Sequence, residues 1–197
     1  RGKSKIMDKL THIYFAHIPF VCDGYICDIR QKEIESCSNF KVKQEKFFIW
    51  KLLEIALKQS LGVDIREVEF KKLENGKWIC DKCQFSLSHS HGIVCVAISD
   101  SYVGVDLEYM DTKRHPMKLV DKTICGDEKC ESETDFFTLW TIKEATFKYA
   151  NESRFDPQKI DTTKITNVKT DYLNIGAERY VYSLVGDSLD NIKVYFK

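Results

Sequence analysis

The sequence predicts an α+β fold built from two similar halves that meet near residue 100. Two segments, 41–60 and 136–149, carry apolar residues at helical spacing. Shorter segments with the alternation typical of strands lie on both sides of each helix. This order, strands and a helix and strands in each half, favours a helix packed on a sheet. No residue-level repeat accompanies it, so the similarity of the halves depends on the order of the elements alone.

The first half contains one long helix and several strands. The helix is predicted over Lys41–Ser60, and Leu61-Gly62 supplies its stop. Val68–Phe70 alternates as a strand, and Asn75-Gly76 is a strong hairpin signal before a second short strand at Trp78–Cys80. The uninterrupted apolar run from residue 93 to 98 predicts a buried strand.

The second half is predicted to hold another helix and a strand pair at its end. Phe136–Tyr149 is the helix, with Thr134 or Asp135 as its N-cap. Tyr180–Leu184 alternates again and is followed by Ile192–Phe196. We expect these last two segments to form a closing pair of antiparallel strands.

Composition narrows the class of protein. Lys and Arg number 30 and so do Asp and Glu, so no net charge attracts nucleic acid or an anionic membrane. The chain has no apolar run of about 20 residues, the length that spans a bilayer. The opening Arg1–Ile6 is polar and basic, which predicts a short leader rather than a signal peptide. Eight cysteines without framework spacing then predict reduced thiols in a cytoplasmic protein.

An acidic pair stands on the predicted strand Val103–Glu108. Period two places its apolar residues on one face and Gly104, Asp106 and Glu108 on the other. Two carboxylates about 7 Å apart on one face repel each other unless a cation lies between them. Such a pair suits Mg²⁺, and Gly104 leaves room beside it for a ligand. The alternative is an acidic strand edge that faces solvent.

The second helix carries an aromatic, an acid and a base in line. Trp140, Glu144 and Lys148 recur every four residues on one stripe, with Lys143 beside them. Glu144 and Lys148 could instead be a helix-stabilising ion pair. Flanking phenylalanines bury the helix, and an acid and a base at a buried helix edge favour a functional site.

Four segments in order, taken together, resemble the signature of the 4′-phosphopantetheinyl transferases. They are Asn75–Lys77, Phe85–Ser90 with its Ser-His-Ser, Val103–Glu108 with Gly-Val-Asp-x-Glu, and Trp140–Lys148 with Trp-x-x-Lys-Glu-Ala-x-x-Lys. The resemblance is to the Sfp type, a monomer built as a pseudo-dimer of two α+β halves, each with a helix on a mostly antiparallel sheet. It implies a half with coenzyme A contacts over residues 1–100 and a half with the magnesium site and catalytic helix over 101–197.

The resemblance also implies an activity, which is transfer of the phosphopantetheine arm of coenzyme A to a serine of an apo carrier protein. Asp106, Glu108 and Glu144 would be the Mg²⁺ ligands. Glu144 would also be the base, directly or through a metal-bound water, and Lys148 would stabilise or protonate the departing phosphate. The coenzyme A contacts implied are Lys46, Lys77, Ser88, His89, Lys143 and Lys148. Other basic residues near the first helix do not match the family register cleanly, so only Lys46 is carried over from them.

The expected partners are coenzyme A and an apo acyl, peptidyl or polyketide carrier protein, which would dock near Thr112–Cys130. No nucleic-acid or membrane partner is expected. Trp78, where the family often has Pro, is expected to pack in its hairpin rather than stack on adenine.

Two other classes of protein stay open at this point. Cys80-x2-Cys83 with Cys125-x4-Cys130, helped by His89 or His91, would make a zinc-stabilised binding module. The other class is an inactive carrier-binding homologue, which the intact acids and lysine argue against.

Overall fold

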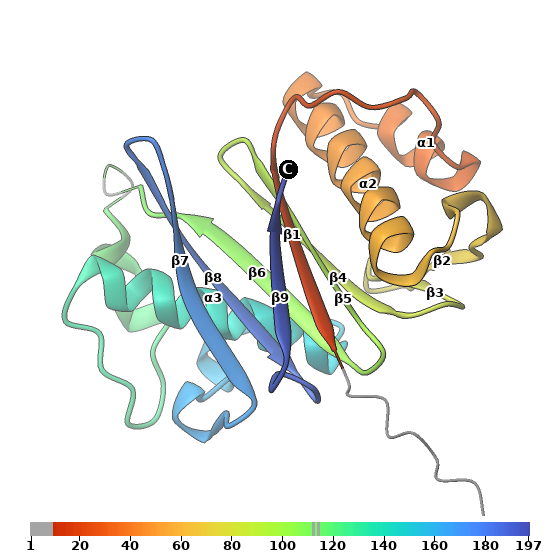
Figure 1. The fold of residues 1–197 in the computed structure, drawn as a ribbon. Coiled ribbons are helices and arrows are strands. Elements are labelled where there is room, and N and C mark those ends of the chain that lie inside the picture. Colours follow the sequence, from red (N-terminus) through yellow and green to blue (C-terminus); the bar gives the residue numbers. More distant parts are fainter. Residues whose placement is uncertain (1–9, 112, 114) are drawn as a thin grey trace, which may run out of the picture.

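Two sheets packed face to face form the centre of the molecule, with a long helix on each outer face (Figure 1). The computed structural model describes residues 10–111, 113 and 115–197. The leader predicted at Arg1–Ile6 lies outside this part. The α+β class predicted from the sequence is confirmed.

The first sheet has the strand order β4-β5-β1-β9, and the second has the order β6-β8-β7. A third, two-stranded sheet is the hairpin of β2 and β3. The strands are β1 Thr11–His17, β2 Phe70–Lys72, β3 Trp78–Cys80, β4 Gln84–Ser90, β5 Ile93–Ser99, β6 Val103–Tyr109, β7 Val168–Ile175, β8 Glu178–Gly186 and β9 Ile192–Phe196. The helices are α1 Asp28–Glu35, α2 Phe40–Leu61 and α3 Glu133–Ala150, with short 3₁₀ turns η1 Ile65–Glu67, η3 Pro116–Lys122, η4 Pro157–Lys159 and η5 Thr162–Lys164.

Alternation along β1 and β5 gives the first sheet two buried faces. Tyr14 and Val96 pack against α2 on the outer side. Phe15 and Cys95 point the other way and pack against the second sheet. Burial on both faces explains why the run 93–98 is uniformly apolar, and the predicted buried strand is confirmed as β5.

Each long helix begins and ends at a recognisable cap. Asn39 accepts the backbone N–H groups of Lys41 and Val42 at the start of α2, and Gly62, at φ +70°, ends it as predicted. In α3 the predicted N-cap was wrong. Ser132 is the N-cap and forms a capping box with Asp135, which lies at the third helical position instead.

The predicted antiparallel pairing at the end of the chain was also wrong. β8 pairs antiparallel with β6 on one side and β7 on the other, so neither of its edges is open to β9. The chain turns after β8, and β9 returns to the first sheet, where it pairs parallel to β1. Residues 192–196 therefore complete the sheet of the first half.

No helix in the described part of the chain is both long enough and apolar enough to span a bilayer.

Candidate active site between β6 and α3

The acidic face of β6 lies against α3, and the alternation that the period-two pattern predicts is confirmed. Val103, Val105 and Leu107 enter the core between the sheets, and Gly104 and Asp106 face the helix. A Cβ atom on Gly104 would lie 2.0 Å from the carbonyl oxygen of Ala145 and only 2.6 Å from the nitrogen of Tyr149. The space beside the acids is therefore filled by the helix backbone. This corrects the expectation that Gly104 leaves room for a ligand.

The close approach brings Lys148 onto Asp106. Its Nζ lies 2.7 Å from Oδ1 of Asp106 and 3.1 Å from the carbonyl oxygen of Val105. Burial disfavours the charged ammonium, but Asp106 and then Glu144 outweigh it and raise the pKa of Lys148. Lys148 thus stays protonated and pairs across to the strand rather than along its own helix.

Glu144 stands one turn earlier on α3, within the field of the same pair. Burial raises the pKa of Glu144, the negative charge of Asp106 raises it further, and Lys148 partly opposes them. A carboxylate whose protonated form is favoured in this way is a better proton acceptor than an exposed one.

The oxygens of the acids fit a hard cation. Oδ1 of Asp106 accepts hydrogen bonds from Lys148 and from Ser88, the latter at 2.8 Å, but buried Oδ2 has no hydrogen-bond partner in the structure. Glu108 accepts a hydrogen bond from Ser90 at 3.1 Å. Within the part of the chain described, no three acid, histidine or cysteine side chains converge into a closed metal centre. Mg²⁺ commonly uses only one or two carboxylates and completes its octahedron with water and phosphate oxygens, so the chemistry of these acids suits it although all three do not converge here.

Lys143, predicted to add positive charge here, lies elsewhere. Its side chain is fully buried and its Nζ lies 2.8 Å from Glu128 and 2.9 Å from the carbonyl oxygen of Pro157, and it also donates to that of Ile160. These contacts tie α3 to the loops on the side away from the acids. We therefore revise the prediction that Lys143 contacts coenzyme A, because its ammonium is already saturated inside the protein.

His89 and Ser88 point to opposite sides of β4. Ser88 faces β6, whereas His89 faces α2, with Nδ1 3.6 Å from Glu45. About half of the His89 side chain is exposed, yet the part against the protein loses enough hydration to lower its pKa. Glu45 opposes that shift and Lys148 adds to it. Burial therefore favours the neutral imidazole.

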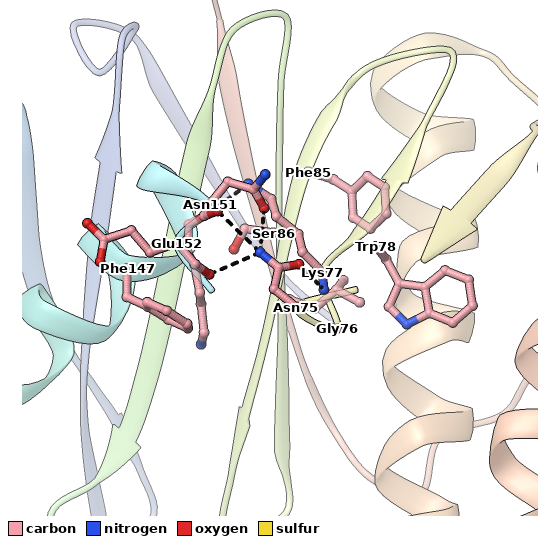
Figure 2. Close-up of a pocket in the computed structure, with 11 residues that line it drawn as sticks. Asn75, Gly76, Lys77, Trp78, Phe85, Ser86, Phe147, Asn151 and Glu152 are labelled. Atoms are coloured by element: carbon pink, nitrogen blue, oxygen red, sulfur yellow. Dashed lines mark hydrogen bonds between the residues drawn. The ribbon is translucent and has the colours of Figure 1, made fainter. Parts of the chain in front are cut away.

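A cavity of about 220 Å³ lies next to Lys148, where the hairpin of β2 and β3 meets the end of α3. Figure 2 shows Asn75 pointing to that helix end, where its amide donates to Asn151 and Glu152. Lys77 donates to the carbonyl oxygen of Lys148 at 2.7 Å, and burial lowers its pKa. The remaining walls are Gly76, Trp78, residues 85–87 and Phe147.

Comparison with known proteins agrees with this geometry. Residues 102–185, which include the acidic strand and α3, match the model of the 4′-phosphopantetheinyl transferase superfamily. A relative from Aneurinibacillus migulanus, described as 4′-phosphopantetheinyl transferase gsp, is 30% identical over 115 residues. That match covers 54% of this chain and 48% of the relative, so the chain spans about half the length of the protein it matches.

Lys46 belongs to a charged cluster that the sequence did not reveal. Glu33 accepts hydrogen bonds from Lys46 at 2.9 Å and Lys72 at 2.7 Å, and it also pairs with Arg30. Although burial opposes it, these three cations lower the pKa of Glu33 to about 2. The guanidinium of Arg30 lies over Trp78, which is 7% exposed, so the prediction that Trp78 packs in the hairpin is confirmed. Only contacts between α1, α2 and β2 create this cluster, so no local motif could have indicated it.

The zinc alternative finds no support in the described residues. The sulfur atoms of Cys80 and Cys83 lie 3.8 Å apart, but Cys125 contacts the buried Lys143 instead. No group of three or more potential ligands forms around either pair in the described part. All eight cysteines are free thiols.

Proposed function

We propose that this protein transfers the 4′-phosphopantetheine group of coenzyme A to a serine of an apo carrier protein. The other product is adenosine 3′,5′-bisphosphate. One observation carries the proposal: β6 and α3 bring Asp106, Glu144 and Lys148 together, with a buried oxygen of Asp106 left without a hydrogen-bond partner. The match of residues 102–185 to the superfamily model and the description of the relative support the same activity.

Each of these residues has a part in the chemistry. Asp106, Glu108 and Glu144 would hold Mg²⁺, which neutralises negative charge on the pyrophosphate when bound. Glu144 accepts the proton of the attacking serine. At the same time the serine oxygen forms a bond to the phosphorus, and the pyrophosphate P–O bond breaks. Lys148, protonated beside Asp106, stabilises the charge that develops on the departing phosphate.

Coenzyme A would lie along the junction that contains the cavity. Lys77 lines that cavity, and His89 stands on the neighbouring strand, where a bound phosphate would favour its charged form. Lys46 belongs to a cluster of three cations and one carboxylate, whose excess positive charge suits a phosphate group. We keep Ser88 in the site through its contact with Asp106.

The acceptor would be a carrier protein of the acyl, peptidyl or polyketide type. We propose that it docks on η3, where Met117 and Leu119 are 37% and 46% exposed. The predicted docking segment begins at Thr112, which lies outside the described residues. We also propose that the enzyme is a monomer and that its halves, 1–100 and 101–197, are related as a pseudo-dimer, with β9 contributed back to the first.

Mass spectrometry of an apo carrier incubated with coenzyme A and Mg²⁺ tests the activity. We expect an added mass of about 340 Da, one phosphopantetheine arm joined covalently. Asp106→Ala or Glu144→Ala should abolish the transfer, whereas Glu131→Ala, an exposed acid that precedes the same helix, should not. Transfer at the wild-type rate by either site variant would contradict the mechanism, and an inactive wild type would favour a carrier-binding homologue.

The metal requirement has a separate test in binding. If carboxylates and pyrophosphate share the cation, coenzyme A should bind more tightly with Mg²⁺ than with EDTA in titration calorimetry. Equal affinity in the two buffers would count against the three acids as ligands.

A further inference from the structure

Three serines on one face of β4 replace the backbone pairing that β6 lacks on its side away from β8. The hydroxyl oxygens of Ser86, Ser88 and Ser90 accept the N–H groups of Val105, Leu107 and Tyr109 at 3.0, 3.1 and 2.9 Å. All three serines are buried. A β6 amide without such an acceptor would lose a buried hydrogen bond, so each serine joins the two sheets.

The same hydroxyls differ in what they donate to. Each has a single hydrogen, and Ser88 gives its hydrogen to Oδ1 of Asp106 while Ser90 gives its own to Oε2 of Glu108. Ser86 occupies the equivalent place opposite Gly104, which has no side chain to receive it. This serine ladder, Ser86, Ser88 and Ser90, therefore contains two residues that contact the acids and one that does not.

We propose that Ser88 and Ser90 are positioning residues that fix the carboxylates of Asp106 and Glu108 for a divalent cation. This inference rests on the proposed function. The hydrogen bond from Ser88, together with Lys148, engages Oδ1 of Asp106 and leaves Oδ2 without a hydrogen-bond partner, ready to bind the metal. Hydrogen bonds that orient metal ligands in this way typically change affinity by about 10–100-fold.

The backbone bonds of the serines strengthen the argument. The oxygen of each serine accepts the β6 amide of the residue after the acid, and the hydroxyl hydrogen is donated to the carboxylate that precedes that amide. Ser88 also lies 3.4 Å from Nζ of Lys148, so both of its acceptor sites and its one donor are in use. A phosphate of coenzyme A would therefore have to displace one of these contacts to bind Ser88 directly.

The test measures Mn²⁺ binding to the protein alone. Electron paramagnetic resonance monitors it as the loss of the signal of the free ion. Ser88→Ala and Ser90→Ala should raise the dissociation constant by about 10–100-fold. Ser86→Ala is the matched control: it loses the same kind of contact to a β6 amide, so its melting temperature should fall similarly, but its Mn²⁺ affinity should not change. Should an alanine variant not fold, the cysteine variant at that position fills the space with a slightly larger group that is only a weak donor.

The outcomes separate this inference from the proposed function. Equal Mn²⁺ affinity in all three serine variants, with binding lost in Asp106→Ala, would overturn the positioning role and leave the metal site in place. A wild type that binds Mn²⁺ no better than Asp106→Ala would overturn both. A selective loss in Ser88→Ala and Ser90→Ala would support the assignment.

Discussion

Gly104→Ala should uncouple α3 from the acidic strand β6. The backbone of Gly104 has no positive φ, so alanine costs nothing there in conformational strain. The effect is purely steric, because the new Cβ would meet the carbonyl oxygen of Ala145 at 2.0 Å and the nitrogen of Tyr149 at 2.6 Å. Both atoms belong to the helix backbone, which cannot change rotamer to make room.

The size of the effect follows from those distances. Ordinary contact begins near 3.4 Å, so a carbonyl oxygen at 2.0 Å must retreat by about 1.4 Å. Overpacking of this kind costs about 1–3 kcal/mol of stability, and occasionally more. The retreat also carries Glu144 and Lys148 away from Asp106. A misplacement of about 1 Å at a catalytic group can cost about 100-fold in rate.

Urea denaturation and the carrier-modification assay measure the two effects separately. Gly24→Ala is the matched control, since a Cβ there would meet no atom within 4 Å. We expect the control to keep both its stability and its rate. If Gly104→Ala were as stable and as active as the control, the close packing of α3 on β6 could not be what assembles the site.

Three further predictions concern groups outside the catalytic centre. Glu33→Gln should lower the free energy of unfolding by about 2–3 kcal/mol above pH 4.5, because the pKa of Glu33 is lowered to about 2 in the folded state. The wild type loses this stability as the pH falls toward 2, so the difference between the two proteins should vanish there. Urea denaturation across this pH range checks both expectations. Iodoacetamide should label Cys80 rapidly at pH 7 and slowly below pH 6, since the hydrogen bond with Cys83 lowers the pKa of Cys80 to about 6. Cys83→Ala should abolish the rapid labelling at pH 7, and mass spectrometry of labelled peptides measures this. Lys143→Met leaves Glu128 buried without its cation, so urea denaturation should show a loss of about 3–5 kcal/mol.

The strand that carries the acids was predictable because apolar and polar residues alternate along it with the period of a strand. Apolar residues alternate with Gly104, Asp106 and Glu108, so any buried sheet would turn the two sets to opposite faces. The limits of α2 were predictable for a similar reason, since the Gly after it permits the left-handed cap. In both cases the deciding interaction is local in sequence.

The rest of the site depends on contacts between distant segments. Lys143 and Lys148 are equally basic, and only the packing of α3 decides that the first pairs with Glu128 and the second with Asp106. The serine ladder was half visible, since residues 86, 88 and 90 alternate, but its role needs β6 as a neighbour. The return of β9 to β1 depends on β8 having both edges occupied.

The two carboxylate oxygens of Asp106 have different surroundings, which connects these contacts to the proposed chemistry. Lys148 and Ser88 both bind Oδ1, so the ammonium and the hydroxyl neutralise one oxygen of the carboxylate and hold its plane. Oδ2 remains buried without a hydrogen-bond partner, which costs stability unless a cation binds there. A divalent ion at Oδ2 would leave Lys148 in place, and the protonated lysine would stand beside the same phosphates as the metal. Burial and the negative charge of Asp106 both raise the pKa of Glu144. A cation that offsets the charge of Asp106 would weaken the second of these effects. Metal binding would thus favour the carboxylate form of Glu144, the form that the proposed mechanism needs to accept the serine proton.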